Sequence, residues 1–358
     1  MGAVRIVVVD DSIFIRKAMV RILRADERVE VIGVAGSGEE LLEHLEEWQP
    51  DLISLDLSMP GMGGLRTLDE IMARRPTPVI ILSSLARETA PLTIEALHRG
   101  AVDFIDKQRY SLVDFQSLSE ILLEKILEIV PTPHGVPAPT EDRTPKAASP
   151  PPRPRPAAHS EFDALLVGAS TGGPLAIQTV LEALREDFQP PVVIVQHMPS
   201  GFTTAFAERL NSHLPFSVLE ASDGDPLLPH TTYLAPGGRH LTLERSGDEL
   251  TIALTETDDG SLHCPSVDRL FLSAAEILGP RALAVLLTGM GHDGAKGLSV
   301  LADRGAYTVA QDESSSIVFG MPRAAIENGA AREVLPLPEI GPRIRELAGR
   351  RLRAHGSE

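Results

Sequence analysis

Short apolar runs alternate with amphipathic stretches along the first part of the chain. The runs cover residues 4–9, 28–34, 52–55, 79–82 and 102–105. Each run has the length of a buried strand, and the stretches between them have the apolar spacing of helices. When strands alternate with helices, each helix returns the chain to the same edge, so the strands pair in parallel. We therefore expect an α/β domain with a doubly wound parallel sheet.

The same alternation returns after residue 160. Apolar runs at 164–168, 192–196, 282–288 and 306–310 have the length of core strands. Between residues 231 and 255, shorter strand-like runs surround Pro236-Gly237-Gly238 and Gly247-Asp248, and such glycine turns favour antiparallel hairpins. The pattern predicts a second doubly wound domain, Rossmann-like and three-layered, with an antiparallel hairpin at its edge.

A proline-rich segment separates the two patterned regions. Residues 131–160 contain 10 of the 29 prolines and no aromatic residue. This composition cannot bury enough apolar surface to offset the entropy lost on ordering, and it favours an extended spacer. We expect three parts, namely a domain at 1–130, a linker at 131–160 and a domain at 161–358.

Charge and composition exclude several classes of function. The 358 residues include 33 Lys plus Arg and 50 Asp plus Glu, for a formal charge of −17. The first domain carries −8, the linker +2 and the second domain −11. A nucleic-acid partner is disfavoured, and with it a DNA-binding output domain, because phosphate neutralisation needs a basic face. One cysteine rules out a disulfide framework, and no apolar run approaches the ~20 residues of a membrane span, so we expect a cytoplasmic protein without membrane insertion.

Five polar residues follow predicted strands of the first domain, and the carboxyl ends of parallel strands meet at one edge. They are Asp10, Asp11, Asp56, Ser83 and Lys107. Three neighbouring carboxylates repel one another unless a divalent cation lies among them, and Mg²⁺ suits oxygen-only ligands. Asp56 could then attack a phosphoryl group, while Lys107 and a serine hydroxyl bind the transferred oxygens. Any one of these residues by itself is more simply a cap or loop residue.

Together these residues resemble the receiver domain of bacterial response regulators, which is flavodoxin-like, over roughly residues 4–128. The resemblance implies that Asp56 accepts phosphate from a histidine kinase and that Asp10 and Asp11 hold Mg²⁺ with it. It also implies switch roles for Ser83 (hydroxyl), Phe104 (aromatic ring) and Lys107 (phosphate-sensing amine). Gln108 departs from the family pattern, which usually has proline after the lysine, so the shape of that loop stays open.

A second group of residues has the composition of a nucleophile, a base and an orienting acid. Residues 168–173 read Gly-Ala-Ser-Thr-Gly-Gly between a predicted strand and helix, a pattern that exposes Ser170 on a tight turn. His197 follows the next strand, which should lie beside the first. Asp293 lies in a glycine-rich loop after a third strand and could orient the imidazole. Glycine turns before helices are common, so the pattern around Ser170 alone is a weak signal. The rival interpretation, a dinucleotide-binding loop, is disfavoured because the G-x-G-x-x-G spacing is absent.

Five segments of the second domain resemble, in order, the catalytic domain of the chemotaxis protein-glutamate methylesterases, over roughly residues 162–350. The segments are 168–173, 196–199, 235–240, 265–268 and 288–294. The resemblance implies hydrolysis of glutamate methyl esters on chemoreceptor cytoplasmic domains, with release of methanol, and deamidation of specific receptor glutamines.

The same resemblance assigns roles to particular residues. Ser170 would be the nucleophile, His197 the general base and then acid, and Asp293 the orienting carboxylate. Thr171 would help to place the imidazole, and the Met290 N–H would lie in the oxyanion hole. No cofactor is expected at this second site.

Both resemblances together imply a phosphorylation-activated esterase that acts in the sensory adaptation of a two-component chemotaxis system, with a chemotaxis-type kinase as phosphodonor. Two alternatives stay open. One is the same enzyme in a receptor-like pathway outside motility. The other is a response regulator whose output domain only binds a partner.

Overall fold

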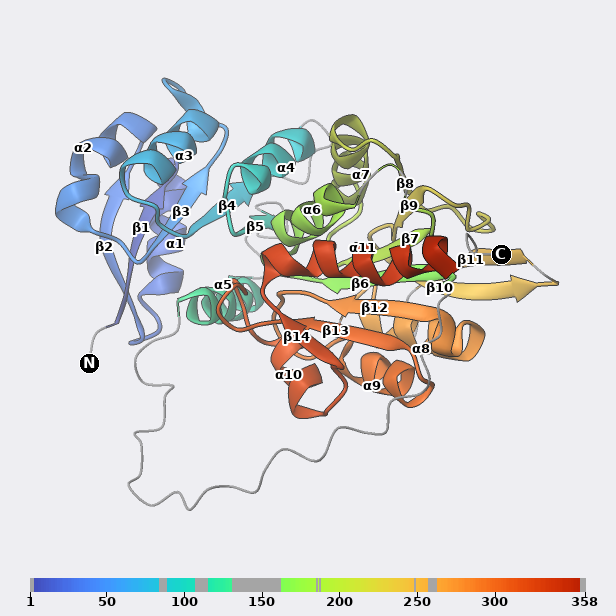
Figure 1. The fold of residues 1–358 in the computed structure, drawn as a ribbon. Coiled ribbons are helices and arrows are strands. Elements are labelled where there is room, and N and C mark those ends of the chain that lie inside the picture. Colours follow the sequence, from blue (N-terminus) through green and yellow to red (C-terminus); the bar gives the residue numbers. More distant parts are fainter. Residues whose placement is uncertain are drawn as a thin grey trace, which may run out of the picture. The chain divides into compact units, whose positions relative to one another are not determined.

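The computed structural model describes residues 3–83, 89–106, 115–130, 162–184, 186, 188–247, 249–256 and 263–354 (Figure 1). Contacts between residues divide the chain into two compact units, with the boundary inside a strand of the first sheet. The first unit is Met1–Ile80 with Arg109–His159, and the second is Ile81–Gln108 with Ser160–Glu358. The predicted proline-rich linker, 131–160, lies outside the described residues.

The first sheet has five strands in the order β2-β1-β3-β4-β5. The strands are β1 (Val4–Val9), β2 (Val29–Ala35), β3 (Leu52–Asp56), β4 (Val79–Ser83) and β5 (Asp103–Asp106). The helices between and after them are α1 (Ile13–Leu23), α2 (Gly38–Trp48), α3 (Gly63–Arg74), α4 (Ala90–His98) and α5 (Phe115–Ile129). β1 pairs in parallel with β2 and β3 because a helix carries each crossover. This confirms the predicted doubly wound sheet.

The second sheet has seven strands in the order β14-β13-β12-β6-β7-β9-β8. They are β6 (Ala164–Ala169), β7 (Val192–Gln196), β8 (Ser217–Glu220), β9 (Thr231–Leu234), β12 (Ala282–Leu286), β13 (Tyr307–Gln311) and β14 (Glu333–Leu335). All neighbouring strands pair in parallel. The three strands that carry the candidate residues, β12, β6 and β7, are therefore adjacent at the centre of the sheet.

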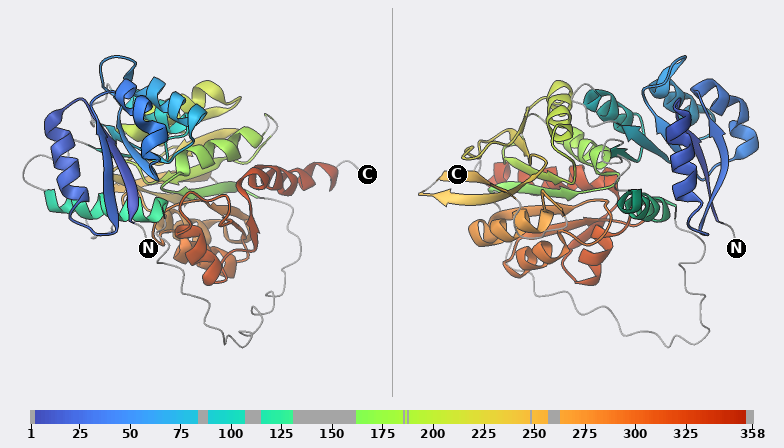
Figure 2. Two further views of the ribbon diagram at one scale, coloured as in Figure 1. Left: turned by 90° about the vertical axis from the view of Figure 1, so that its left-hand side faces the viewer. Right: turned by 180° about the vertical axis from the view of Figure 1, so that it is seen from behind.

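Helices cover both faces of this sheet and make three layers. They are α6 (Gly173–Ala183), α7 (Phe202–His213), α8 (Val267–Ile277), α9 (Ala295–Asp303), α10 (Met321–Glu327) and α11 (Leu337–Ala354). Figure 1 and the right-hand view of Figure 2 show α6, α7 and α11 on one face and α8, α9 and α10 on the other. Among the described residues, no helix combines the length and the apolar composition needed to cross a membrane.

The hairpin prediction is confirmed at the second turn, although that hairpin does not form the edge of the main sheet, and it is wrong at the first turn. β10 (Arg239–Ser246) and β11 (Glu249–Glu256) pair antiparallel and form a separate two-stranded sheet. The turn at Pro236-Gly237-Gly238 does not join a hairpin, because β9 before it pairs in parallel with β7 and β8. Gly237 instead permits close approach, since a Cβ there would lie 2.3 Å from the carbonyl carbon of Pro199.

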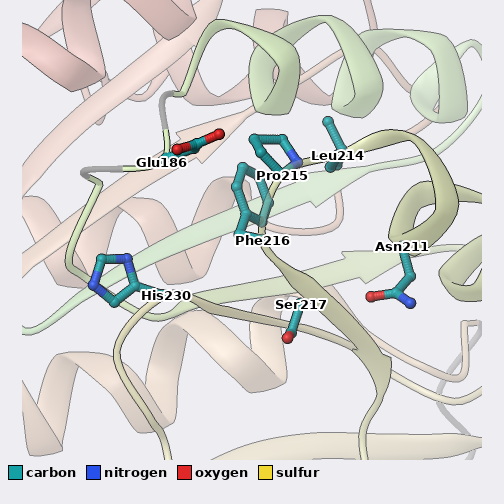
Figure 3. Close-up of a pocket in the computed structure, with 7 residues that line it drawn as sticks. All are labelled: Glu186, Asn211, Leu214, Pro215, Phe216, Ser217 and His230. Carbon is teal, nitrogen blue, oxygen red and sulfur yellow. The ribbon is translucent and has the colours of Figure 1, made fainter.

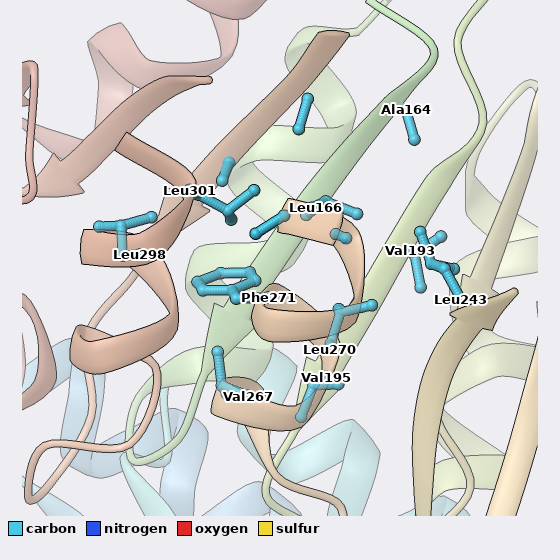
Figure 4. Packing of buried hydrophobic residues seen from close by; sticks show 14 of the residues in the cluster. Ala164, Leu166, Val193, Val195, Leu243, Val267, Leu270, Phe271, Leu298 and Leu301 are labelled. Atoms are coloured by element: carbon cyan, nitrogen blue, oxygen red, sulfur yellow. The ribbon is translucent and has the colours of Figure 1, made fainter. Parts of the chain in front are cut away.

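The core beneath the second sheet fixes the position of α8. Its inward positions follow the spacing of an amphipathic helix and are fully buried; they are Val267, Leu270, Phe271 and Ala274. Figure 4 shows the Phe271 ring packed with Leu166 of β6 and with Leu298 and Leu301 of α9. This packing sets where the N-terminal end of α8 lies, and that end holds a candidate functional residue.

Truncation of this ring tests how much of the stability depends on the α8 core. Phe271→Ala should lower the free energy of unfolding by about 3–5 kcal/mol, because the cavity left by a buried aromatic ring does not collapse fully. Urea unfolding measures the change. The control Leu228→Ala removes a side chain that is 52% exposed and should change stability by less than about 0.5 kcal/mol. Equal effects of the two substitutions would contradict the assigned core.

Candidate active site

Ser170 lies on the turn between β6 and α6. Gly172 has a φ of 75°, a conformation that favours glycine, and Ser170 on this turn is half-buried. The Ser170 N–H donates to the Thr288 carbonyl at 3.0 Å. Gly289 lies so close that a Cβ there would be 2.7 Å from the Ser170 Cβ. The turn is therefore held against the loop that follows β12.

His197 follows β7, the neighbour of β6, and bridges two other side chains. Its Nδ1 lies 3.2 Å from Ser170 Oγ, and its Nε2 lies 2.8 Å from Asp293 Oδ2. In the neutral ring, Nε2 carries the proton that is donated to Asp293, so the Nδ1 lone pair faces the serine hydroxyl. This orientation is the reverse of the common serine-protease arrangement, in which Nε2 faces the serine. The geometry still gives a base in contact with a hydroxyl.

Asp293 is held as an anion at the N-terminal end of α8. Its Oδ1 accepts from Ser266 Oγ and from the Asp268 N–H, both at 2.9 Å, and its Oδ2 accepts from the Val267 N–H at 2.7 Å. Burial by itself would raise the pKa of Asp293. The hydrogen bond and charge of His197 and the N–H groups of Asp268 and Val267 outweigh burial and hold the pKa well below its ordinary value. The carboxylate is charged at neutral pH and fixes the imidazole through Nε2.

The loop after β12 is anchored from both sides. The Thr288 N–H donates to Gln311 Oε1 at 2.8 Å, and the Thr288 hydroxyl donates to the Thr171 carbonyl at 3.0 Å. Met290 follows Gly289, whose backbone lies against Ser170, so this loop passes beside the serine. The loop is therefore held in place beside Ser170.

The Thr171 hydroxyl donates to Asp103 Oδ2 at 2.8 Å. The resemblance implied that Thr171 helps to place the imidazole, and that role stays a prediction. His263 lies on the face of the imidazole, where the two rings stack with centroids 4.3 Å apart and an interplanar angle of 13°.

Three residues at this site, Ser266, Gln196 and His263, received no role from the sequence, although Gln196 and Ser266 lie in the segments 196–199 and 265–268. Ser266 is the N-cap of α8, and serine before an amphipathic helix is a cap signal that could have identified it. Gln196 and His263 reach their partners through tertiary packing between segments far apart in the chain, for which a single sequence holds no local signal.

In the first unit three carboxylates come together as predicted. Oxygens of Asp10, Asp11 and Asp56 all lie within 4.8 Å of one another, with Asp10 and Asp56 buried and Asp11 exposed. The N–H of Ser12 donates to Asp10 at 2.9 Å, and that of Ser58 donates to Asp56 at 3.0 Å, which fixes both carboxylates. A group of carboxylate oxygens alone fits Mg²⁺, which prefers hard oxygen ligands.

The predicted switch residues are only partly described. The Ser83 hydroxyl at the end of β4 is buried and lies 2.6 Å from the Thr93 hydroxyl of α4. Phe104 of β5 is buried and stacks on Phe202 of α7, with ring centroids 4.4 Å apart. Lys107 lies outside the described residues, as does Gln108.

A separate hollow of about 410 Å³ lies elsewhere on the second unit (Figure 3). Its lining residues are Glu186, Asn211, Leu214, Pro215, Phe216, Ser217 and His230. β8 begins at Ser217 and β9 begins just after His230, so the hollow lies at the amino ends of parallel strands. Ser170 and His197 follow carboxyl ends, and the hollow is therefore distinct from the candidate active site.

Comparisons with known proteins agree with both groups of residues. Residues 165–344 match the family described as CheB methylesterase, and residues 6–114 match the response regulator receiver domain. A protein-glutamate methylesterase/protein-glutamine glutaminase of Bordetella parapertussis is 42% identical over 359 residues, covering 98% of this chain and 99% of that protein. Another so named, from Geobacter sulfurreducens, is 40% identical, covering 96% of this chain and 98% of that protein. The crystal structure of the Thermotoga maritima CheB methylesterase catalytic domain gives a TM-score of 0.51 at 39% identity, covering 52% of this chain and 99% of that one.

The lowered pKa of Asp293 predicts a pH-dependent contribution to stability. A carboxylate with a lowered folded-state pKa stabilises the protein fully above its ordinary pKa of 3.8 and loses this effect as pH falls towards the folded value. The difference in unfolding free energy between wild type and Asp293→Asn should be constant near pH 7 and shrink below about pH 4. Urea unfolding at several pH values measures it. Glu327→Gln, on the exposed surface of α10, is the control. A difference that does not change with pH would contradict the assignment.

Proposed function

Because this chain belongs to the CheB methylesterase family and carries a response regulator receiver domain, we propose that it hydrolyses glutamate methyl esters on the cytoplasmic domains of chemoreceptors. It releases methanol, and it deamidates specific receptor glutamines. The names of its full-length relatives support both activities. The observation that carries the proposal is the contact of His197 Nδ1 with Ser170 Oγ at 3.2 Å, in a ring whose Nε2 is bonded to Asp293.

The chemistry follows from these contacts. His197 Nδ1 takes the hydroxyl proton as Ser170 Oγ attacks the ester carbonyl, and the Asp293 carboxylate stabilises the imidazolium that forms. The imidazolium returns that proton to the departing methoxide, so methanol leaves and an acyl-enzyme remains. Water, deprotonated by the same nitrogen, then releases the glutamate carboxylate and restores Ser170. With a glutamine substrate, ammonia leaves in place of methanol.

The oxyanion of each tetrahedral intermediate needs fixed donors. We assign this role to the Met290 N–H, since its loop lies against Ser170 and is anchored through Thr288. The N-terminal end of α6, which begins just after the serine, adds a favourable partial positive charge. Neither donor requires a metal at this site.

The receiver domain supplies control. Asp56 accepts a phosphoryl group from a chemotaxis-type histidine kinase, and Asp10, Asp11 and Asp56 hold Mg²⁺, which when bound neutralises charge around the acceptor. Ser83 and Lys107 bind the transferred oxygens, and Phe104 is the aromatic switch residue. Phosphorylation activates the esterase and thereby produces sensory adaptation.

The proposed division of the chain is a receiver domain at 1–130, a linker at 131–160 and a methylesterase domain at 161–358. The matched ranges 6–114 and 165–344 fall inside these limits and support them. We place the protein in the cytoplasm, where its kinase and the receptor segments would meet it, and we propose no nucleic-acid partner because both domains are acidic.

Removal of the nucleophile tests the esterase proposal. Ser170→Ala should lower methanol release from methylated receptor cytoplasmic domains by at least ~10³-fold, because it removes the hydroxyl on which the acyl-enzyme forms. Mass spectrometry of the receptor locates the methyl groups that are lost. Ser299→Ala, which removes a hydroxyl on α9, should leave the rate unchanged. Full activity of Ser170→Ala would exclude this residue as the nucleophile.

Removal of the phosphoacceptor tests the regulation. Acetyl phosphate with Mg²⁺ should raise methanol release by the full chain several-fold, and chelation of Mg²⁺ by EDTA should abolish the increase. Asp56→Ala should keep the unstimulated rate and lose the increase. Asp51→Ala removes an exposed carboxylate just before β3 and should respond as wild type does. A phosphodonor effect that persists in Asp56→Ala would contradict the assigned acceptor.

A further inference from the structure

The paired strands that carry Ser170 and His197 end just before these residues. The register of β6 with β7 runs to Ala169↔Gln196, and the His197 N–H donates to the Ala169 carbonyl at 3.2 Å. Beyond this point the chain turns into α6 on one side and into a loop on the other. Sheet pairing therefore ends one residue before Ser170 and His197. It does not by itself set the distance between Ser170 Oγ and His197 Nδ1.

A side chain continues the connection where the sheet pairing ends. The Gln196 amide nitrogen donates to the Ser170 carbonyl at 2.9 Å and to the His197 carbonyl at 3.2 Å. Gln196 is only 2% exposed, so water does not compete for these bonds. Only one orientation of the amide is compatible with two carbonyl acceptors, because the opposite one would place three oxygens together.

Gly173 makes room for this side chain. A Cβ at Gly173 would lie 2.0 Å from Gln196 Oε1 and 2.8 Å from the Ala169 Cβ. The left-handed conformation of the turn belongs to Gly172, so conformation does not explain the second glycine. The Gly173 N–H also donates to the Ser170 carbonyl at 2.7 Å, which gives that carbonyl two donors.

The orientation of the imidazole makes the contact between Ser170 and His197 depend strongly on the two main chains that the Gln196 amide joins. The nitrogen that faces Ser170 is Nδ1, which is bonded to the ring carbon nearest the main chain. The position of Nδ1 therefore follows the backbone of residue 197 more closely than the position of Nε2 does. The distance between Ser170 Oγ and His197 Nδ1 therefore depends on the separation of the two backbones, which Gln196 spans.

We infer that Gln196 is a positioning residue, whose amide joins the main chains of the nucleophile and the base and sets the distance between Ser170 Oγ and His197 Nδ1. The inference rests on the proposed roles of Ser170 and His197. It is independent of which ester is the substrate, so a probe that needs only an activated serine can test it.

The first experiment compares Gln196→Met with wild type in the full chain. A fluorophosphonate probe reacts when Ser170 Oγ attacks phosphorus, fluoride leaves and His197 takes the hydroxyl proton. Methionine keeps the length of the side chain but cannot donate, so the labelling rate per folded molecule should fall by about 10- to 100-fold, the cost of a displacement near 1 Å. Gln178→Met, which removes an amide on α6 that donates to Glu182, should label at the wild-type rate. Labelling of Gln196→Met within twofold of wild type would overturn the inference.

The second experiment uses Gln196→Glu and measures how its labelling rate changes with pH, so a difference in folding stability between the variant and wild type does not affect the result. Burial and two facing carbonyls should raise the pKa of the introduced carboxyl. The protonated acid can donate one hydrogen bond, whereas the carboxylate repels both carbonyls. The ratio of its labelling rate to that of wild type should therefore fall about tenfold or more as pH rises through this pKa. A ratio that is independent of pH would contradict the positioning role, because loss of packing alone does not titrate.

The two proposals fail in different ways. If the probe labels Ser170 and Gln196→Met slows it, but methylated receptor loses no methyl groups, the positioning role stands and the substrate assignment fails. If Ser170 of the wild-type protein is not labelled, both the nucleophile and the positioning role are contradicted.

Discussion

The carboxylate of Asp293 accepts hydrogen bonds from the first turn of α8 and from the His197 imidazole at the same time. A buried anion needs several donors, and here a helix end, a capping serine and the imidazole supply them. Packing of Phe271 decides where that helix end lies, so the hydrophobic core fixes the carboxylate and the carboxylate fixes the ring. The chemistry of the second unit depends on this connection between packing and charge.

Ser170 is held in place in a different way. Ser170 is placed by its own turn, by the Thr288 carbonyl and by the Gln196 amide, all through its main chain. Its hydroxyl is thus left to the imidazole. The His197 ring is positioned through its side chain and Ser170 through its backbone. Both residues can therefore be held rigidly without competing for the same hydrogen bonds.

The sequence alone was sufficient for the doubly wound fold and for its core strands, because strand runs and helical spacing are local signals, but it did not predict the edge strands β8 and β14. It placed Ser170, His197 and Asp293 at strand ends, and the sheet order explains why they meet, although their roles stay predictions. It was wrong about the turn at Pro236-Gly237-Gly238, since glycine there serves close approach and not strand reversal. It did not find Gln196 or His263, whose contacts arise only when distant segments pack.

The strand order of the second sheet has a consequence for how activity is lost. Local opening of a folded protein starts at edges and loops, where few contacts must break, and central strands open last. β12, β6 and β7 are central, whereas β14 and β8 are the edges. Fraying at either edge leaves the strands of the three candidate residues intact. We therefore expect the contacts among the three candidate residues to be lost only when the central strands unfold, and to persist when an edge strand opens.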